Sequence, residues 1–248
     1  MGLFYTPSSL IDLSGGTLSV EGEEFFHITR VLRKKVGEVV HVTDGEGLSI
    51  TADISKIGKS GLTAAIVERG HVPPSSTKVA VAMSLLKSSQ RFDFFLEKAT
   101  ELGVSCIIPM ITERTVSLPK TEKVNSKQER WKKVLVSALR QAKRYYLPDI
   151  TGPLHFDEVL HLEGYDIKMI PYEASEIIPE ASFSGRNVLF IVGGEGGFTE
   201  DEVESARQKG FREISLGRST LRAETAGVFA VAMVRSQLVV NEQPGEWL

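Results

Sequence analysis

A buried apolar segment that runs directly into a glycine-rich loop constrains this chain more than any other feature. Val188 to Val192 are five apolar residues, three of them β-branched, and they are followed by Gly193-Gly-Glu-Gly-Gly197. The apolar run is typical of a buried strand, and the glycines expose bare backbone where that strand ends. A second backbone-exposing turn, Leu216-Gly217, opens the segment that ends at Ala226. We therefore expect these two loops to bind a ligand.

Composition and charge narrow the class of protein. The chain has 248 residues, 42% hydrophobic and 25% charged, which is typical of a globular protein of one or two domains. No apolar run approaches the roughly 20 residues that span a bilayer, and no signal-peptide pattern is present, so we expect a cytoplasmic protein without a membrane segment. The single cysteine, Cys106, excludes an internal disulfide. The five histidines show no ligand spacing, so no metal site is expected.

The net charge of −3 conceals two basic clusters. Between Arg114 and Arg144 there are ten basic and two acidic residues, so this segment carries +8 and the rest of the chain −11. The second cluster, Arg30, Arg33, Lys34 and Lys35, belongs to a helical pattern from Glu23 to Lys35. The apolar residues that can share one face of that helix are Phe25, Phe26, Ile28, Val31 and Leu32. Solvated surface would explain both clusters, but clusters of this kind in an acidic chain favour contact with nucleic-acid phosphates.

The pattern of elements predicts two domains. Residues 1–72 contain short β-branched runs broken by glycine, which predict a small β-barrel, and the proline-containing segment His71 to Thr77 marks the boundary. Residues 73–248 alternate strand and helix patterns, so we expect an α/β domain with a parallel sheet and helices on both faces. Strands are predicted near 79–85, 104–111, 167–172, 188–192 and 213–216, and helices near 90–102, 126–142, 199–210 and 223–240.

Three of these helices carry further signals. Ser126 with Glu129, and Thr199 with Glu202, have the spacing of capping boxes, so a helix is expected to begin at each. The last helix is apolar on every side between 228 and 234, which predicts packing against something larger than its own domain, such as a second copy of the chain.

The two loops predict one ligand pocket, because ligands of parallel sheets bind beyond the carboxyl ends of the strands. The glycine loop matches neither of the common nucleotide-binding glycine patterns, and alone it could be only a tight strand-to-helix connection. The second loop favours a pocket, since it adds Arg222, Glu224 and Thr225 where the last helix begins. Main-chain groups of two such loops can hydrogen-bond a purine and an amino-acid tail.

Five segments, taken together, resemble one protein family. They are Gly193-Gly-Glu-Gly-Gly-Phe-Thr-x-x-Glu202, Leu216-Gly217 with Leu221 to Ala226, Glu97 to Gly103, Arg130-Trp131 followed by Gln141, Arg144 and Pro148, and His27 with Val31 to Arg33. The first is similar to the Gly-Pro-Glu-Gly-Gly-Phe-Ser/Thr-x-x-Glu motif of the bacterial 16S ribosomal RNA uridine-N3 methyltransferases, the RsmE family of the SPOUT class. The resemblance covers nearly the whole chain.

The resemblance implies a PUA-like RNA-binding barrel over 1–72 and a SPOUT methyltransferase domain, tied in a trefoil knot, over 73–248. It also implies a homodimer and S-adenosyl-L-methionine as cofactor, with 16S rRNA or the assembled small ribosomal subunit as substrate. The implied cofactor contacts are Tyr172, Glu173, Gly193, Gly194, Gly196, Leu216, Gly217, Leu221 and Arg222. The expected RNA contacts are Arg30, Arg33, Lys34, Arg130, Gln141 and Arg144.

Methylation of uridine N3 requires loss of the N3 proton, and the base must be unpaired because N3 lies on its Watson–Crick edge. Arg222 is expected to stabilise the developing anion, and Glu195 and Glu224 are the alternative bases. Each glutamate also has a structural interpretation. Glu195 could brace its loop, and Glu224 could support the first turn of the last helix.

The chain departs from the family pattern at three places. Gly194 stands where the family has proline, which should make the empty loop more mobile. Ser219 and Thr220 occupy positions where the family often has a further arginine, and the first four residues lack an early arginine. Three alternatives stay open: a SPOUT methyltransferase acting on a different RNA, a non-catalytic RNA- or ribosome-binding protein, and a small-molecule nucleotide-binding enzyme.

Overall fold

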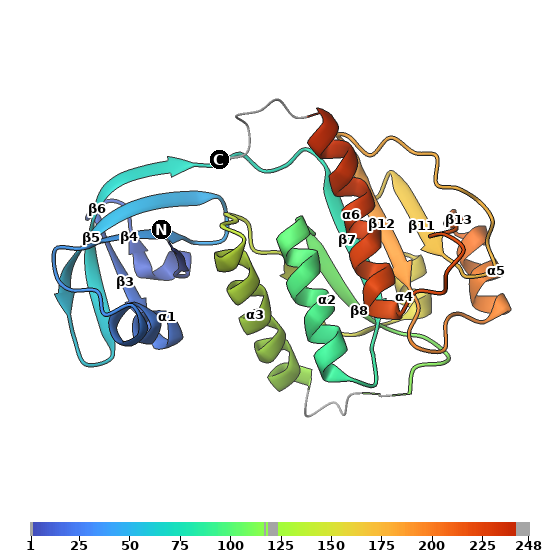
Figure 1. Cartoon of the computed structure of the whole chain (residues 1–248), viewed down its shortest axis with the longest axis horizontal. Helices are drawn as coiled ribbons and strands as arrows, with labels where there is room; N and C mark the ends of the chain where they lie inside the picture. Colours follow the sequence, from blue (N-terminus) through green and yellow to red (C-terminus); the bar gives the residue numbers. More distant parts are fainter. Residues whose placement is uncertain (1, 117, 119–123, 242–248) are drawn as a thin grey trace. The chain divides into compact units, whose positions relative to one another are not determined.

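The chain divides into two compact units in this computed structural model, which describes residues 2–116, 118 and 124–241 (Figure 1). The first unit comprises residues 1–74 and 136–147, and the second comprises 75–135 and 148–248. Residues 136–147, which the sequence places in the second domain, cluster with the first unit in the structure. The side chains of this segment contact the first unit, as the pair of Glu24 and Arg140 shows.

A six-stranded sheet with the strand order β1-β4-β5-β6-β3-β2 forms the first unit. Only the pair of β1 and β4 is parallel; the other neighbours are antiparallel. The Thr6 hydroxyl, just after β1, donates to the carbonyl of Ser19 in β3 at 2.7 Å, so the sheet curls until its two ends approach each other. The strands are β1 Leu3–Tyr5, β2 Ile11–Asp12, β3 Thr17–Glu21, β4 Val39–Thr43, β5 Leu48–Ile57 and β6 Gly61–His71, with a 3-10 turn at Ser8–Leu10.

The helix expected from Glu23 to Lys35 is interrupted. An α-helix, α1, spans Gly22–Phe26, and a π-helical turn follows at His27–Val31, where the Leu32 amide bonds the His27 carbonyl five residues back. The wider turn moves later side chains off the face that an α-helix would present. Of the five apolar residues predicted to share that face, Ile28 is buried and Phe25 packs on the core. The other three are exposed by 60, 57 and 47%: Phe26, Val31 and Leu32.

A seven-stranded sheet forms the centre of the second unit, with the order β10-β8-β7-β12-β11-β13 and β9 beside β8. Every pairing in it is parallel, so the carboxyl ends of its strands share one edge. The strands are β7 Lys78–Ser84, β8 Cys106–Ile111, β9 Asp149–Ile150, β10 Leu154–His155, β11 Ile167–Pro171, β12 Asn187–Val192 and β13 Arg212–Ile214.

Helices cover both faces of this sheet (Figure 1). One face packs on α4 and α5, which contribute Val159 and Val203 to a core that includes Ala82 of β7. On the other face α2 and α6 pack against each other, and α6 also contacts β7 and β12. A Cβ at Gly227 of α6 would lie 2.7 Å from the Phe95 ring of α2, so only glycine allows this close approach. The helices are α2 Ser89–Leu102, α3 Val124–Gln141, α4 Phe156–Leu160, α5 Glu200–Gln208 and α6 Ala223–Asn241.

Of the two capping boxes expected from the sequence, the structure has the one at Thr199 as a helix start and not the one at Ser126. The Thr199 hydroxyl accepts from the Glu202 amide at 3.2 Å, and the Glu202 carboxylate accepts from the Thr199 amide at 2.9 Å, so this box is confirmed. The box at Ser126 is wrong as a helix start, because α3 already begins at Val124. At its other end α3 closes on Lys143, which has a left-handed φ of 54°. Arg144 therefore lies beyond the end of the helix.

Within the part of the chain that the structure describes, every helix falls short, in length or in apolar character, of what a membrane crossing requires.

Candidate functional site

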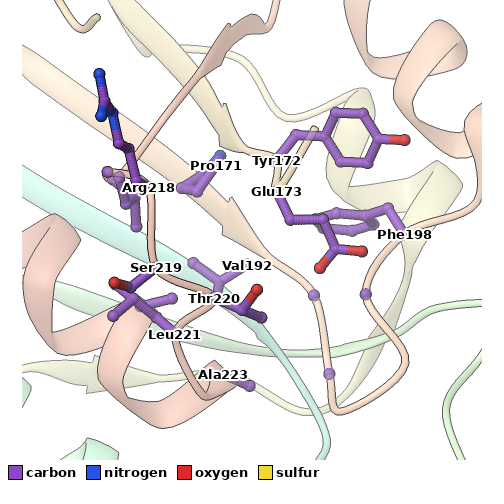
Figure 2. A pocket seen from close by; sticks show the side chains of 16 residues that line it. Pro171, Tyr172, Glu173, Val192, Phe198, Arg218, Ser219, Thr220, Leu221 and Ala223 are labelled. Carbon is purple, nitrogen blue, oxygen red and sulfur yellow. The ribbon is translucent and has the colours of Figure 1, made fainter. Parts of the chain in front are cut away.

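Three neighbouring strand ends build one pocket. Because β11 pairs in parallel with both β12 and β13, the segments that follow these strands emerge side by side. They enclose about 700 Å³ of empty space, the open mouth included, which is within the range of small-molecule sites (Figure 2). We call this cavity the strand-end pocket. Its lining is Pro171, Tyr172, Glu173, Val192, Gly193, Gly194, Gly197, Phe198, Leu216, Gly217, Arg218, Ser219, Thr220, Leu221, Ala223 and Ala226.

Most of the predicted cofactor contacts come together here. Seven of them line the strand-end pocket: Tyr172, Glu173, Gly193, Gly194, Leu216, Gly217 and Leu221. Gly196 and Arg222 do not line it, and Arg222 is exposed. The other lining residues, such as Phe198 and Thr220, were missed, although contiguity with the predicted residues of the same loops is a signal that could have found them.

The glycine loop is folded back on itself. The Gly197 amide donates to the Gly194 carbonyl at 3.1 Å, and Gly197 has a φ of 64°, a left-handed conformation that favours glycine. A Cβ at Gly194 would lie 3.0 Å from the Ser84 hydroxyl, so this backbone runs close to the end of β7. The loop therefore presents main-chain groups to the pocket with little side-chain cover.

Arg114 clamps the same loop from outside the pocket. Its Nη1 donates to the carbonyl of Gly196 at 2.7 Å and to that of Phe198 at 3.2 Å. The charge of Arg114 had counted toward the basic segment, so sequence reasoning missed this role. The next cations of that segment, Lys120 and Lys123, lie outside the described residues.

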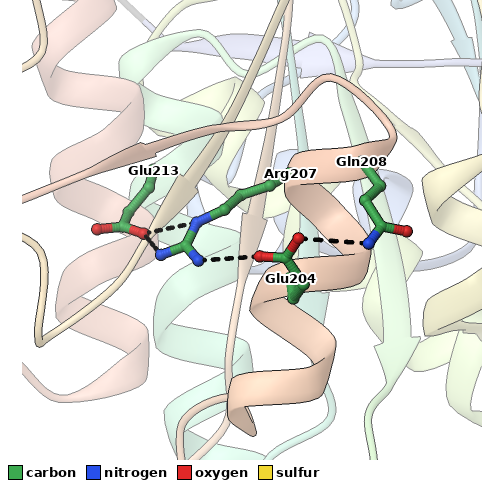
Figure 3. Close-up of polar contacts among 4 residues, drawn as sticks. All are labelled: Glu204, Arg207, Gln208 and Glu213. Atoms are coloured by element: carbon green, nitrogen blue, oxygen red, sulfur yellow. Dashed lines mark hydrogen bonds and ion pairs between the residues drawn. The ribbon is translucent and has the colours of Figure 1, made fainter.

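The second loop is anchored where it leaves β13 (Figure 3). Arg207 of α5 donates from Nε to Glu213 of β13 at 3.1 Å and from Nη1 to Glu204 at 3.1 Å, and Gln208 donates to Glu204 at 3.3 Å. Burial raises the pKa of Glu213, but hydrogen bonds from Arg207 and Ser175 and the Arg207 charge outweigh it, so the pKa lies below its ordinary value. An ionised Glu213 thus ties α5 to the strand before Leu216.

The lining of the strand-end pocket is mixed in chemistry. Figure 2 shows Tyr172, Glu173 and Phe198 on one side and the segment from Ser219 to Ala223 on the other, while the Arg218 side chain extends away from Glu173. Aromatic and aliphatic groups can hold a flat ring, and the Glu173 carboxylate favours a positively charged ligand. The exposed main-chain groups of the glycine loop can hydrogen-bond polar atoms.

The predicted bases Glu195 and Glu224 lie beside Arg91 and not in the lining of the strand-end pocket. Arg91 Nη1 is 4.0 Å from Glu195 Oε1, and Arg91 Nε is 3.7 Å from Glu224 Oε1. The Lys87 amide also donates to Glu195 Oε1 at 3.1 Å. Glu224 is only 7% exposed, and its Oε2 is buried without a hydrogen-bond partner among the described residues. Arg91 was missed, since nothing in the α2 sequence pattern marks it.

Comparison with known protein families shows which family this chain belongs to. Residues 73–235 match an RNA methyltransferase domain, and residues 20–67 match an RNA methyltransferase PUA domain. The chain belongs to this RNA methyltransferase family. The expected α/β class with a parallel sheet and the N-terminal PUA domain are thereby confirmed, while the trefoil knot stays a prediction.

Several relatives of this methyltransferase are similar over almost their whole length. A ribosomal RNA small subunit methyltransferase E from Mycobacterium bovis is 30% identical over 239 residues, which cover 94% of this chain and 90% of the relative. The crystal structure of a ribosomal RNA small subunit methyltransferase E from Neisseria gonorrhoeae, bound to S-adenosyl methionine, is 29% identical with a TM-score of 0.84, covering 95% of this chain and 97% of that one. A methyltransferase from Legionella pneumophila, in complex with the bound cofactor SAM, is 28% identical with a TM-score of 0.82, covering 94 and 96%.

The predicted RNA contacts of the methyltransferase fall in both units, and several already have partners in the chain. In the first unit Arg30, Arg33 and Gln141 are exposed, whereas Lys34 Nζ donates to the Val39 carbonyl at 2.8 Å. Arg144 is partly buried. In the second unit Arg130 is exposed but forms an ion pair with Asp93.

Proposed function

We propose that the protein transfers a methyl group from S-adenosyl-L-methionine to N3 of a uridine in 16S ribosomal RNA of the small subunit. The observation that carries this proposal is the strand-end pocket, in which the glycine loop and the Leu216 loop of this RNA methyltransferase chain meet at neighbouring strand ends. A uridine target also follows from the resemblance of these loops to the uridine-N3 methyltransferases.

The residues of the strand-end pocket fit this cofactor. Main-chain groups at Gly193, Gly194 and Leu216 can pair with the edge of adenine. The Glu173 carboxylate favours the positive charges of the ligand. When bound, S-adenosyl-L-methionine supplies a methyl group activated by its sulfonium and leaves as a neutral thioether.

The chain's own residues must handle the uridine. N3 becomes nucleophilic only when its proton has moved to an acceptor, and the two glutamates beside Arg91, Glu195 of the glycine loop and Glu224, are the candidates. A cation near the base stabilises the negative charge that spreads over the uracil carbonyls, and Arg222 and Arg91 are the candidates.

The first unit supplies RNA affinity in this proposal. The end of α1 and the π-helical turn that follows it carry the exposed Phe26, Val31 and Leu32 near Arg30 and the other cations of that cluster. An exposed aromatic ring among cations suits unpaired RNA, because bases stack on the ring while the cations neutralise phosphates. A protein that acts on ribosomal RNA in bacteria works in the cytoplasm.

Mass spectrometry of small-subunit RNA tests the proposed reaction. RNA from a strain lacking the protein should lose one N3-methyluridine, which returns on complementation with the wild-type gene and not with the Gly217→Trp variant, because Gly217 lines the strand-end pocket and its φ of 112° does not suit tryptophan. An unchanged N3-methyluridine content contradicts the uridine assignment. If another RNA class loses a methyl group instead, the enzyme acts on that RNA. If purified protein binds 16S RNA but calorimetry shows no S-adenosyl-L-methionine binding, the protein is a non-catalytic binder.

The protein acts as a homodimer in this proposal, and α6 supplies the surface. Phe229 is 46% exposed on an apolar helix, and with Met233 and Ile178 it lines a broad groove between α6 and the segment that follows β11. An apolar groove of this kind supports burial against a second copy of the chain. Light scattering coupled to size exclusion should give twice the chain mass, and Phe229→Glu should shift it toward one chain mass. A monomeric wild-type protein contradicts the dimer.

A further inference from the structure

A second cavity lies beside the strand-end pocket, on the other side of the glycine loop. It is lined by Lys87, Ser88, Arg91, Val116 and Glu195. Gly194 lines the strand-end pocket and the next residue, Glu195, lines this cavity, so consecutive residues of one loop border both spaces. We call the second cavity the Arg91 pocket. Molecules bound in the two cavities would therefore contact consecutive residues of the same loop.

In the Arg91 pocket, the Lys87 amide and the Arg91 guanidinium both lie near the Glu195 carboxylate. Glu195 Oε1 is held by the Lys87 amide at 3.1 Å and lies 4.0 Å from Arg91 Nη1. The ion-pair distances of Arg91 to both glutamates exceed hydrogen-bond length, so its N–H groups are available to a ligand. Ser88 is the N-cap residue of α2, and its hydroxyl makes no capping bond. The lining of the pocket therefore combines donors on Arg91 and Ser88 with the Glu195 carboxylate.

This pattern is complementary to the Watson–Crick edge of uracil. Uracil presents an acceptor, the N3–H donor and a second acceptor in that order, whereas cytosine has an acceptor at N3 and a donor beside it. A carboxylate with a guanidinium donor beside it matches N3–H and an adjacent carbonyl of uracil, and it opposes the unprotonated N3 of cytosine. We propose that the Arg91 pocket is the subsite for the target uracil, with Glu195 accepting the N3 proton and Arg91 donating to an adjacent carbonyl. This inference rests on the proposed function.

The proton transfer balances within the subsite. The N3–H bond breaks, the proton forms an O–H bond with the Glu195 carboxylate, and the bond's electron pair remains on N3. The negative charge left on the uracil spreads to its carbonyls, one of which faces the Arg91 guanidinium. After the reaction Glu195 returns its proton to water, because its side chain is 35% exposed.

Burial distinguishes the two glutamates that the sequence left as alternatives. The Glu224 side chain is only 9% exposed, which leaves little access for a nucleobase, whereas the Glu195 side chain borders an open cavity. Glu224 instead holds Arg91 from the protein side at 3.7 Å. We therefore assign Glu224 as a positioning residue that orients the Arg91 guanidinium toward the pocket.

Binding of short RNAs, with S-adenosylhomocysteine present, tests the subsite without turnover. The RNAs carry uridine, cytidine or N3-methyluridine at the target position. Wild-type protein should bind the uridine RNA at least about tenfold more tightly than either analogue, since one charge-assisted hydrogen bond is lost in each. Glu195→Gln and Arg91→Ala should reduce this preference to about twofold or less, whereas Glu163→Gln, an exposed control, should keep it. An unchanged preference in both pocket variants overturns the subsite.

Chemical rescue separates a proton acceptor from a structural brace. A 5-fluorouridine target has a more acidic N3–H, so the loss of methylation rate in Glu195→Gln should shrink at least about tenfold on that RNA. An equal loss on uridine and 5-fluorouridine contradicts the assignment of Glu195. Glu195→Asp keeps the carboxylate and should retain the uridine preference, which guards against misfolding of the amide variant. If the wild-type enzyme itself makes no N3-methyluridine, the proposed function fails together with the subsite. If it does, while the pocket variants behave as wild type, the subsite alone fails.

Discussion

Arg207 and Glu213 join α5 to β13 by paired hydrogen bonds from the guanidinium Nε and Nη2 to one carboxylate oxygen. The folded protein lowers the pKa of Glu213, so this group stabilises the fold above its unfolded pKa and loses that effect as the pH falls through the folded pKa. Arg207→Ala should therefore reduce stability at pH 7, and by progressively less as the pH falls through the folded pKa of Glu213.

Urea denaturation of both proteins across this pH range measures the difference. Arg207→Lys is the matched control, since lysine keeps the charge but not the forked pair of donors. A constant difference between wild type and Arg207→Ala at every pH would show that the ion pair has no part in it.

The pKa of Glu24, which is paired with Arg140, is shifted in the opposite direction to that of Glu213. Burial raises the pKa of Glu24 more than the Arg140 charge and hydrogen bond lower it, so the folded state binds this proton more tightly than the unfolded state. Stability from this group is full below the unfolded pKa and falls as the pH rises toward the folded pKa. Arg140→Ala removes the partner, so it should destabilise the protein by about 2 kcal/mol at pH 7 and by less at pH 4.

The double variant Glu24→Gln with Arg140→Ala checks this explanation by denaturation at the same two pH values. It removes the stranded charge, so it should recover part of the lost stability at pH 7. Failure of the double variant to exceed Arg140→Ala at pH 7 would contradict the explanation.

Gly194 stands in the glycine loop where the resembling family has proline. Gly194→Pro restores the residue of the resembling family and removes backbone freedom from the empty loop, so affinity for S-adenosyl-L-methionine should rise about two- to fivefold. Isothermal titration calorimetry measures this affinity. Gly194→Ala adds the Cβ near Ser84 without fixing φ, so it isolates the cost of that contact. If the Gly194→Pro variant binds S-adenosyl-L-methionine more weakly than the Gly194→Ala variant does, the native φ at this position does not suit proline.

Near the π-helical turn, the exposed ring of Phe26 should bind RNA by stacking on a base, and the cation of Arg30 should bind it by contacting a phosphate. Phe26→Ala should weaken binding of single-stranded target RNA about tenfold with little change in salt dependence, because a stacked base is lost. Arg30→Ala should reduce the slope of log affinity against log salt by about 0.7, because one phosphate contact is lost. Leu13→Ala is the control, since Leu13 is also exposed in the first unit. Filter binding across a salt series measures both effects, and equal losses in all three variants would exclude a specific surface.

Strong apolar patterns predicted the second unit well. The continuous apolar run from Val188 to Val192 is buried as a central strand, as a run of that length and composition predicts. The Leu216 loop and the glycine loop met as expected. In a parallel sheet, knowing that a segment follows a strand places it at the carboxyl edge.

Four features could not be predicted from local patterns. The π-helical turn at His27 breaks the period on which the helix prediction relied. Arg91 reaches glutamates more than a hundred residues away, and Arg114 bonds carbonyls about eighty residues away, so neither has a signal in its own segment. The start of α3 before Ser126 shows that capping spacing predicts a favourable position and not the only one.

The discontinuous first unit has a consequence for biosynthesis. Its β-strands end by His71, yet residues 136–147 also belong to it, and they include Arg140, the partner of Glu24. A nascent chain emerges from its N-terminus, so the strands of this unit leave the ribosome well before the segment that completes it. The buried carboxylate of Glu24 must wait for its cation until more than half of the polypeptide has been made.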